Sequence, residues 1–280
     1  MAEWRRLTYT VPESSLERLV VCLHELGCLG AQHEAGRVDA YFPGRTDAAL
    51  LTAAVQQELG AAGRELALES SELVPDGMWQ ERWVASLTPF EVGRRLLIVP
   101  GEATSATSSE RIPIRISPGS AFGTGEHVTT RMCLEMLEGQ ARLGESLLDV
   151  GTGSGILAIA GYLLGAGPIL ALDTDTTAVE VARRNARANG AAQIMFAAAS
   201  VEALAPERFD LVVANIDARA LARLAGPLAR RSRRRAILSG ILLDQEPEVL
   251  SAFERHGLLP SETSRGEGWV AVSLRRRGDD

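Results

Sequence analysis

The fold class of this chain is decided by one stretch, Leu147-Leu148-Asp149-Val150-Gly151-Thr152-Gly153-Ser154-Gly155. An apolar strand with a single carboxylate, Asp149, leads there into three glycines at alternate positions. Glycine lets a backbone turn tightly and approach a ligand with no side chain in between. The residues that follow, Ile156 to Leu164, have the composition of an apolar helix, whose first N–H groups would face that ligand. The stretch therefore predicts a strand, a ligand-binding turn and a helix.

The glycine spacing separates two kinds of nucleotide-type cofactor. A dinucleotide-binding turn has the pattern G-x-G-x-x-G/A and needs a small residue at position 156, where this chain has Ile156. A nicotinamide-dependent reductase is therefore disfavoured. A glycine turn that holds no ligand stays open as an alternative, because such turns recur on many folds.

Two polar residues stand at the ends of later strand-like runs. Asp173 follows the run Pro168–Leu172, where a carboxylate can accept hydrogen bonds from both hydroxyls of a ribose. Asp175, two residues further on, is interpreted as a solvated loop residue. Asn215 follows the run Leu211–Ala214, and its side-chain oxygen could accept a hydrogen bond from a nucleophilic amine, although Asn is also a common turn former.

Two segment patterns divide the chain. Residues 1–74 follow the order strand, helix, strand, strand, helix, strand, which is typical of a ferredoxin-like α+β module. From Ile112 onward, strand-like runs alternate with helical segments, as in a parallel sheet covered by helices. We therefore expect a small N-terminal domain (1–74), a linker (75–110) and a Rossmann-like, doubly wound α/β domain (111–280). The predicted helices of the N-terminal module are Glu13–Leu26 and Asp47–Leu59, and the predicted strands of the chain are Arg5–Val11, Cys28–Gln32, Arg37–Phe42, Glu65–Leu73, Arg95–Val99, Ser146–Val150, Pro168–Leu172, Leu211–Ala214, Ala236–Leu238 and Trp269–Leu274.

The composition is that of an ordinary globular protein, with 46% hydrophobic and 23% charged residues among 280. A formal net charge of −7 argues against a surface that is basic everywhere. The three cysteines form no metal-binding pattern with the four histidines, so no metal is expected and a reducing compartment suits them. No signal peptide or membrane span is apparent, and we expect a cytoplasmic protein.

A longer motif upstream of the glycine turn carries a family resemblance. Residues 118–130 are Pro-Gly-Ser-Ala-Phe-Gly-Thr-Gly-Glu-His-Val-Thr-Thr. Together with Gly151–Ile159, Asn215-Ile216 and Ser239-Gly240-Ile241-Leu242, they resemble the PrmA family of bacterial methyltransferases that act on ribosomal protein L-11. The sharp motifs all lie between Pro118 and Leu242, while the organisation matches from about Trp4 to Leu274.

The resemblance implies a class I methyltransferase domain that binds S-adenosylmethionine, an N-terminal domain that recognises the protein substrate, and a linker that includes Trp79 and Trp83. Asn215 would be the catalytic residue, orienting a lysine or N-terminal amine, and no strong general base is expected. His127 is interpreted as a residue that fixes a loop rather than one that transfers protons, since histidine serves both roles. The residues implied in cofactor binding are Phe122, Gly123, Thr124, Gly125, His127, Thr130, Asp149, Gly151, Thr152, Gly153, Gly155, Asp173 and Asn215.

Departures from the family pattern bear on the substrate. Gly101 follows Pro100 where family members commonly have Trp, and Asp217 adds a carboxylate beside the presumed amine site. The segment before the Asn215 strand offers only Ser200 and Glu202 as polar contacts to an adenine. Methylation of another protein's lysine or of another amino group therefore stays an alternative. So does a binding module that holds the cofactor without turnover.

The run Arg230–Arg235 is a local basic patch. A ribosomal substrate would make a weak contact to RNA through this run useful. A solvated helix end is the favoured interpretation, because cations suit a helix C-terminus. The segment Arg275–Arg277 has the same ambiguity.

Overall fold

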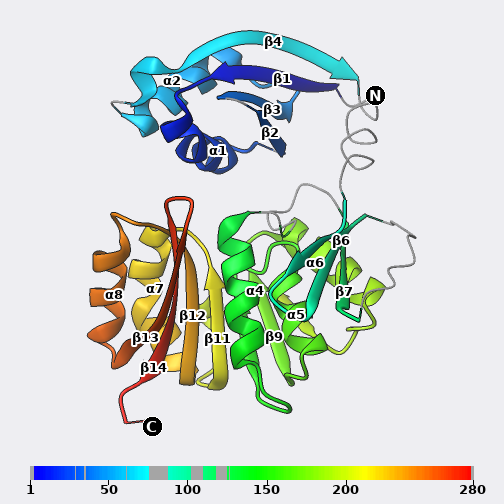
Figure 1. Ribbon diagram of the computed structural model, residues 1–280, viewed down its shortest axis with the longest axis vertical. Helices are drawn as coiled ribbons and strands as arrows, with labels where there is room; N and C mark the ends of the chain where they lie inside the picture. The colour runs from blue at the N-terminus through cyan, green and yellow to red at the C-terminus, as the bar shows by residue number, and fades with distance from the viewer. Residues whose placement is uncertain are drawn as a thin grey trace. The chain divides into compact units, whose positions relative to one another are not determined.

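The computed structural model describes residues 3–28, 30–34, 36–60, 62–75, 88–101, 110–117, 125 and 127–278. The chain divides into two compact units, residues 1–87 and 88–280 (Figure 1). Trp79 and Trp83, which the resemblance places in a linker, lie outside the described residues.

The N-terminal unit is a four-stranded antiparallel sheet with two helices. Its strands lie in the order β2-β3-β1-β4. With the helices inserted after the first and third strands, this is the ferredoxin-like arrangement, so the fold predicted for this module is confirmed. Side chains such as Leu7, Val38 and Val55 are fully buried in its core. Its elements are β1 (Glu3–Thr10), a 3-10 turn (Glu13–Ser15), α1 (Leu16–Glu25), β2 (Gly30–Glu34), β3 (Arg37–Pro43), α2 (Ala48–Leu59), a second 3-10 turn (Ala62–Glu65) and β4 (Ala67–Pro75).

The C-terminal unit is built on a seven-stranded sheet in the order β10-β9-β8-β11-β12-β14-β13 (Figure 1). The first five strands are parallel, and β14 is inserted antiparallel between β12 and β13. The doubly wound α/β class is thus confirmed, and the antiparallel edge distinguishes this sheet from the all-parallel dinucleotide-binding fold. The elements are α4 (Val128–Gln140), β8 (Leu147–Val150), α5 (Ile156–Leu163), β9 (Ile169–Asp173), α6 (Thr176–Ala188), β10 (Met195–Ala198), a 3-10 turn (Val201–Ala203), β11 (Phe209–Asn215), α7 (Ala218–Arg231), β12 (Ser232–Leu242), α8 (Glu246–Glu254), β13 (Leu258–Gly266) and β14 (Trp269–Arg276).

Alternate residues of the central strands face two different helix layers. Val212, Ala214 and Leu238 belong to the core beneath α7 and α8. The residues between them face α4 and α5, and there β11 ends at Asn215, whose side chain is hydrogen-bonded to the first turn of α4. Because Asn215 shares this face with Asp149 by alternation, both polar residues lie on the α4 side of the sheet.

A separate three-stranded sheet precedes α4. It consists of β5 (Phe90–Val92), β6 (Leu96–Pro100) and β7 (Ile112–Ile116), with β6 central. Strands β5 and β6 fall within the range 75–110 that we expected to be a linker, yet they belong to the C-terminal unit. The apolar run of β6 is wholly buried, which explains why these residues pack instead of spanning a gap.

Strands that lie toward the margins of the large sheet were not predicted from the sequence. β13 is an edge strand containing Pro260 and several exposed polar residues, so it shows no apolar alternation. β10, at the other edge, is only four residues long. Among the described helices, none is long and apolar enough to cross a membrane.

Candidate active site

The candidate site lies at the carboxyl ends of β8 and β11. The chain leaves β8 toward β9 and β10 on one side, whereas β11 and β12 lie on the other, so the strand order reverses between β8 and β11. In open α/β sheets, ligands bind at the carboxyl ends of the strands at such a reversal. The glycine turn follows β8, and Asn215 is the last residue of β11. Topology therefore brings together the two motifs that the sequence singled out.

The turn itself needs glycine at all three positions. Gly151, Gly153 and Gly155 have φ angles of 75°, 52° and 84°, a region that other residues rarely adopt. Gly151 and Gly153 are partly accessible, whereas Thr152, Ser154 and Gly155 are buried. The turn therefore presents backbone without side chains to a ligand.

The amide groups of the turn are largely used inside the protein. The N–H groups of Gly151 and Thr152 both donate to Leu172 O at 2.9 Å, and that of Gly155 donates to Thr152 O at 2.8 Å. These three N–H groups are therefore not available as donors to a ligand. The turn allows a ligand to approach the backbone closely, but it offers few free hydrogen-bond donors.

Asp149 is a fully buried carboxyl beneath the turn. Its Oδ2 accepts a 2.7 Å hydrogen bond from the Thr152 hydroxyl, and its Oδ1 has no hydrogen-bond partner among the described residues. Burial raises the pKa of Asp149 to about 7, even though the Thr152 hydrogen bond opposes this shift. Thr152 thus uses its hydroxyl to hold Asp149, and neither side chain reaches the surface.

Asp173 faces the glycine turn across the sheet edge. Its Oδ2 accepts a hydrogen bond from Gly153 N at 2.9 Å, and its Oδ1 accepts one from Asp175 N at 3.0 Å. These two bonds fix the carboxylate beside the turn and leave further lone pairs for hydroxyl donors. Asp175 is exposed, but it also caps helix α6, because its Oδ1 accepts from Thr177 N at 2.8 Å.

Asn215 is held by two hydroxyl groups from the first turn of α4. Its Nδ2 donates to Thr129 Oγ1 and to Thr130 Oγ1, each at 3.3 Å. Both threonines are 1% exposed, so this end of the amide is enclosed. The amide oxygen accepts no hydrogen bond from a described residue, which leaves an oriented acceptor at the end of β11. Sequence reasoning missed Thr129, whose contact with Asn215 spans 86 positions of the chain.

His127 caps helix α4. Its Nδ1 lies 2.7 Å from Thr129 Oγ1 and accepts from Thr129 N at 3.3 Å. Its ring meets Trp269 edge to face, with centroids 5.2 Å apart. Because Nδ1 accepts the N–H of Thr129, the Thr129 hydroxyl donates its proton to Nδ1 and accepts from Asn215. These contacts agree with a loop-fixing histidine.

Two glycines make room for the residue after Asn215. A Cβ added to Gly151 would lie 2.2 Å from Ile216 Cγ2, and one added to Gly240 would lie 2.3 Å from Ile216 O. The turn after β8 and the bend in β12 therefore close around Ile216 from two sides. Gly240 belongs to the Ser239–Leu242 motif, and its φ of 83° also favours glycine.

Other predicted residues take different places. Phe122, Gly123 and Thr124 lie outside the described residues, whereas Gly125 is buried with a φ of 94° beside Ile98 and Ile156. A second residue that the sequence did not indicate is Asn185 of α6, which is 1% exposed. Its Nδ2 donates to Ser154 O at 2.8 Å and its Oδ1 accepts from Ser117 N at 3.1 Å, so it joins the glycine turn to the end of β7.

The departures from the family pattern have local structural roles. Asp217 caps helix α7, because its Oδ1 accepts from Ala220 N at 2.8 Å. Ser200 caps the short 3-10 turn through Glu202 N at 3.4 Å, and its hydroxyl lies 3.3 Å from Glu202 Oε2. Gly101 forms a turn at the end of β6, with its N–H donating to Ile116 O at 2.8 Å.

The sheet order, the glycine turn without a dinucleotide spacing, and an oriented amide at the end of β11 define a class I, S-adenosylmethionine-dependent methyltransferase. The family model described as "Ribosomal protein L11 methyltransferase (PrmA)" matches residues 21–277. The chain belongs to this family.

Known relatives support the same placement. A protein of Geobacter sulfurreducens named "Ribosomal protein L11 methyltransferase" is 39% identical over 252 residues, which cover 88% of this chain and 83% of that protein. One of Pelobacter propionicus with the same name is 44% identical over 206 residues, covering 71% of this chain and 66% of its own length. The crystal structure of a ribosomal protein L11 methylase from Lactobacillus delbrueckii subsp. bulgaricus is similar with a TM-score of 0.63 at 30% identity, over 68% of this chain and 98% of that one.

Proposed function

We propose that this protein transfers methyl groups from S-adenosylmethionine to lysine side-chain and N-terminal amines of ribosomal protein L-11. The names of its relatives supply the substrate. The observation that carries the chemistry is the Asn215 amide, whose donor end is enclosed by Thr129 and Thr130 and whose oxygen is left to accept a hydrogen bond. An amine nitrogen is the donor that such an oxygen would orient.

The residues around the glycine turn fit the cofactor. Gly151 and Gly153 are partly accessible backbone in a conformation that a side chain would obstruct, and Asp173 is fixed beside them with spare acceptor capacity. We assign Gly151, Gly153 and Gly155 to the approach of the methionine part, and Asp173 to the ribose hydroxyls. Thr130, Thr152, His127 and Asp149 would act behind them as supports, with Phe122, Gly123, Thr124 and Gly125 closing over the cofactor by family resemblance.

Methyl transfer to a neutral amine depends on orienting the amine more than on a general acid or general base. When bound, S-adenosylmethionine supplies a sulfonium methyl group, and the amine lone pair forms the new C–N bond as the C–S bond breaks. A lysine amine, which in water ordinarily loses its proton only near about pH 10.4, must be neutral to attack. Asn215 would hold the neutral amine in line, and such positioning can contribute several kcal/mol to the rate. Asp149, enclosed beneath Thr152, has no route to the amine.

We assign substrate recognition to the N-terminal domain (1–74). Of the range 75–110 that we expected to be a linker, the part from residue 88 onward belongs to the catalytic unit, so we assign the linker to residues 75–87. A weak contact to RNA through Arg230–Arg235 is the second proposed interaction. Arg233, Arg234 and Arg235 form ion pairs with carboxylates of their own unit, so within this run Arg230 is the most available. A cytoplasmic location follows from a ribosomal substrate.

A second candidate function is methylation of another amino group. An adenine methyltransferase would show Asn/Asp-Pro-Pro-aromatic after the strand, whereas this chain has Asn215-Ile216-Asp217. The test is a methyl-transfer assay with labelled S-adenosylmethionine on L-11, on an unrelated lysine-rich protein and on an adenine oligonucleotide. The proposal expects label on L-11 alone. Label on the lysine-rich protein or on the oligonucleotide instead of L-11 would show that L-11 is not the substrate. Cofactor binding with no label on any acceptor would indicate a binding module.

A further inference from the structure

Positive charge is concentrated along one edge of the large sheet, the edge opposite the candidate site. We define this basic edge as the loops and strand ends at the amino ends of β8, β11, β12 and β13 and at the carboxyl end of β14. Its arginines are those of segments Arg230–Arg235 and Arg275–Arg277 together with Arg142, Arg208 and Arg255. The described residues of this edge include eleven arginines and four carboxylates (Glu145, Glu207, Asp210 and Glu254), so their formal net charge is +7. Since the whole chain carries −7, all other residues together carry −14.

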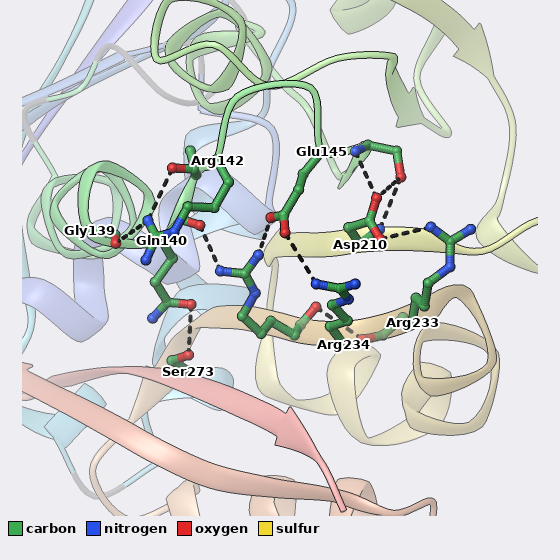
Figure 2. Close-up of polar contacts among 12 residues, drawn as sticks. Gly139, Gln140, Arg142, Glu145, Asp210, Arg233, Arg234 and Ser273 are labelled. Atoms are coloured by element: carbon green, nitrogen blue, oxygen red, sulfur yellow. Dashed lines mark hydrogen bonds and ion pairs between the residues drawn. The ribbon is translucent and has the colours of Figure 1, made fainter. Parts of the chain in front are cut away.

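Hydrogen bonds and ion pairs tie the inner arginines of this edge to the fold (Figure 2). Arg233 pairs with Asp210 at 2.7 Å and Arg234 lies 3.6 Å from Glu145. Arg235 also pairs with Glu145 and donates to Gln140 O at 2.8 Å. Arg276 donates to Ser232 O at 2.8 Å. These contacts cross-link the ends of neighbouring strands and hold the edge in one shape.

A second set of arginines on the same edge is exposed. Among the described residues, Arg208, Arg230, Arg275 and Arg277 form no ion pair with a carboxylate. The backbone of Arg208 is fixed, because its carbonyl accepts from Arg233 Nη2 at 3.1 Å. The inner contacts therefore present the outer guanidinium groups on a rigid base.

We propose that the basic edge binds the phosphate backbone of RNA. The five strands that end there span about 19 Å at the usual strand spacing, a row wide enough for several phosphates. The cations here are arginines, as they are throughout this chain, and a planar guanidinium suits bidentate contact with phosphate. One large apolar side chain, Leu143, is exposed beside Arg142, which is too little for a membrane-anchoring face.

Binding at this edge leaves the candidate site open. Strand β11 begins at Phe209 on the basic edge and ends at Asn215 in the site, a length of about 20 Å for its seven residues. RNA and protein substrate can therefore be bound together. The inference rests on the RNA contact proposed above for Arg230–Arg235 and extends it to the whole edge. It does not depend on which amine is methylated, so failure of the methyl-transfer assay would leave it standing.

The test measures the affinity of the full chain for a fluorescein-labelled single-stranded RNA of mixed sequence. Binding is monitored by fluorescence anisotropy over a range of salt concentrations. We expect affinity to fall steeply with salt, because each phosphate contact to a single strand adds about 0.7 to the slope of log K against log salt. The triple variant Arg208→Gln, Arg230→Gln, Arg275→Gln should bind roughly tenfold or more weakly at low salt, with the slope reduced by about 2.

The matched control removes the same charge elsewhere, with Arg94→Gln, Arg184→Gln, Arg187→Gln, all exposed and outside the segments that define this edge. It should keep both the affinity and the slope, and both triple variants should methylate free L-11 at the parent rate. Equal weakening by the two triple variants would overturn the proposal, since net charge alone would then explain binding. Edge-dependent binding of phosphatidylserine vesicles or polyglutamate without RNA binding would overturn it in favour of a lipid or an acidic protein.

Discussion

Asn215 has its orientation set by hydroxyl groups that the sequence does not place near it. Its Nδ2 is shared between Thr129 and Thr130, and Thr129 is in turn within 2.7 Å of His127 Nδ1. Each of these bonds is modest by itself, but together they determine which end of the amide faces the substrate. At this scale, the candidate site is a small hydrogen-bond network in which the Asn215 amide oxygen accepts no hydrogen bond from a described residue.

Replacing Asn215 should separate chemistry from binding. In Asn215→Ala the amine loses its acceptor, so we expect methyl transfer to fall by about 100-fold or more. Cofactor affinity, measured by calorimetry, should change little because the glycine turn and Asp173 are untouched. Comparable losses of cofactor affinity and transfer would contradict the proposed role.

Thr129 should act as a positioning residue. Thr129→Val removes the hydroxyl that accepts from Asn215, and we expect kcat to fall about fivefold, in line with one hydrogen bond of about 1 kcal/mol, with KM for the cofactor unchanged. Thr129→Ser keeps the hydroxyl and should restore kcat. Failure of the serine variant to recover activity would point to packing instead.

Two carboxyls, the fully buried Asp149 and the partly buried Asp210, should influence stability with opposite pH dependence. Burial raises the pKa of Asp149 to about 7, so its folded form holds a proton that the unfolded chain releases near pH 4. Folding stability therefore falls as pH rises from about 4 to about 7, by up to about 4 kcal/mol. Asp149→Asn should remove this slope in urea unfolding measured across that range.

Asp210 supplies the matched comparison. Partial burial alone would raise its pKa, but hydrogen bonds from Arg233 and Ser146 lower the pKa of Asp210 to about 2. Its stabilisation, about 2 kcal/mol, is present above about pH 4 and is lost as pH falls toward 2. Asp210→Asn should therefore cost stability at neutral pH and little at pH 2. The same slope for both variants would contradict these assignments.

At the scale of elements, sequence pattern was sufficient wherever a segment is buried on both sides or is strongly periodic. The order of the N-terminal module and the strands β8, β9, β11 and β14 were predicted because buried strands must be apolar. Strands β10 and β13 were missed because an edge strand needs no such pattern. The glycine turn and Asn215 were found, whereas Thr129 and Asn185 act through hydrogen bonds between distant segments, which one sequence does not reveal.

The bend of β12 at Gly240 should affect activity through Ile216. In Gly240→Ala, the new Cβ would lie 2.3 Å from Ile216 O, so the backbone next to Asn215 must move. We expect a loss of stability of about 1–3 kcal/mol and reduced methyl transfer. Gly190→Ala is the control, since its φ of 69° carries similar strain but nothing lies within 4 Å of the added Cβ. Normal methyl transfer by Gly240→Ala, at a temperature where this variant is folded, would contradict the role of the close packing of Gly151 and Gly240 around Ile216.

At the scale of the whole molecule, the two edges of the large sheet have different chemistry. The carboxyl edge carries the glycine turn and Asn215, while the amino edge carries the arginines. All 29 residues counted as Lys or Arg are arginine, so the 280 residues contain no lysine. A protein that methylates lysine amines therefore offers none of its own, and any methyl-lysine formed in an assay must come from the substrate.

The most direct measurement of the central claim is intact mass spectrometry of L-11 after incubation with this protein and S-adenosylmethionine, followed by amino-acid analysis of the hydrolysed mixture. We predict that L-11 gains mass in steps of one methyl group and that the hydrolysate contains methylated lysine. Unchanged L-11 mass under conditions where the protein binds S-adenosylmethionine would contradict the account.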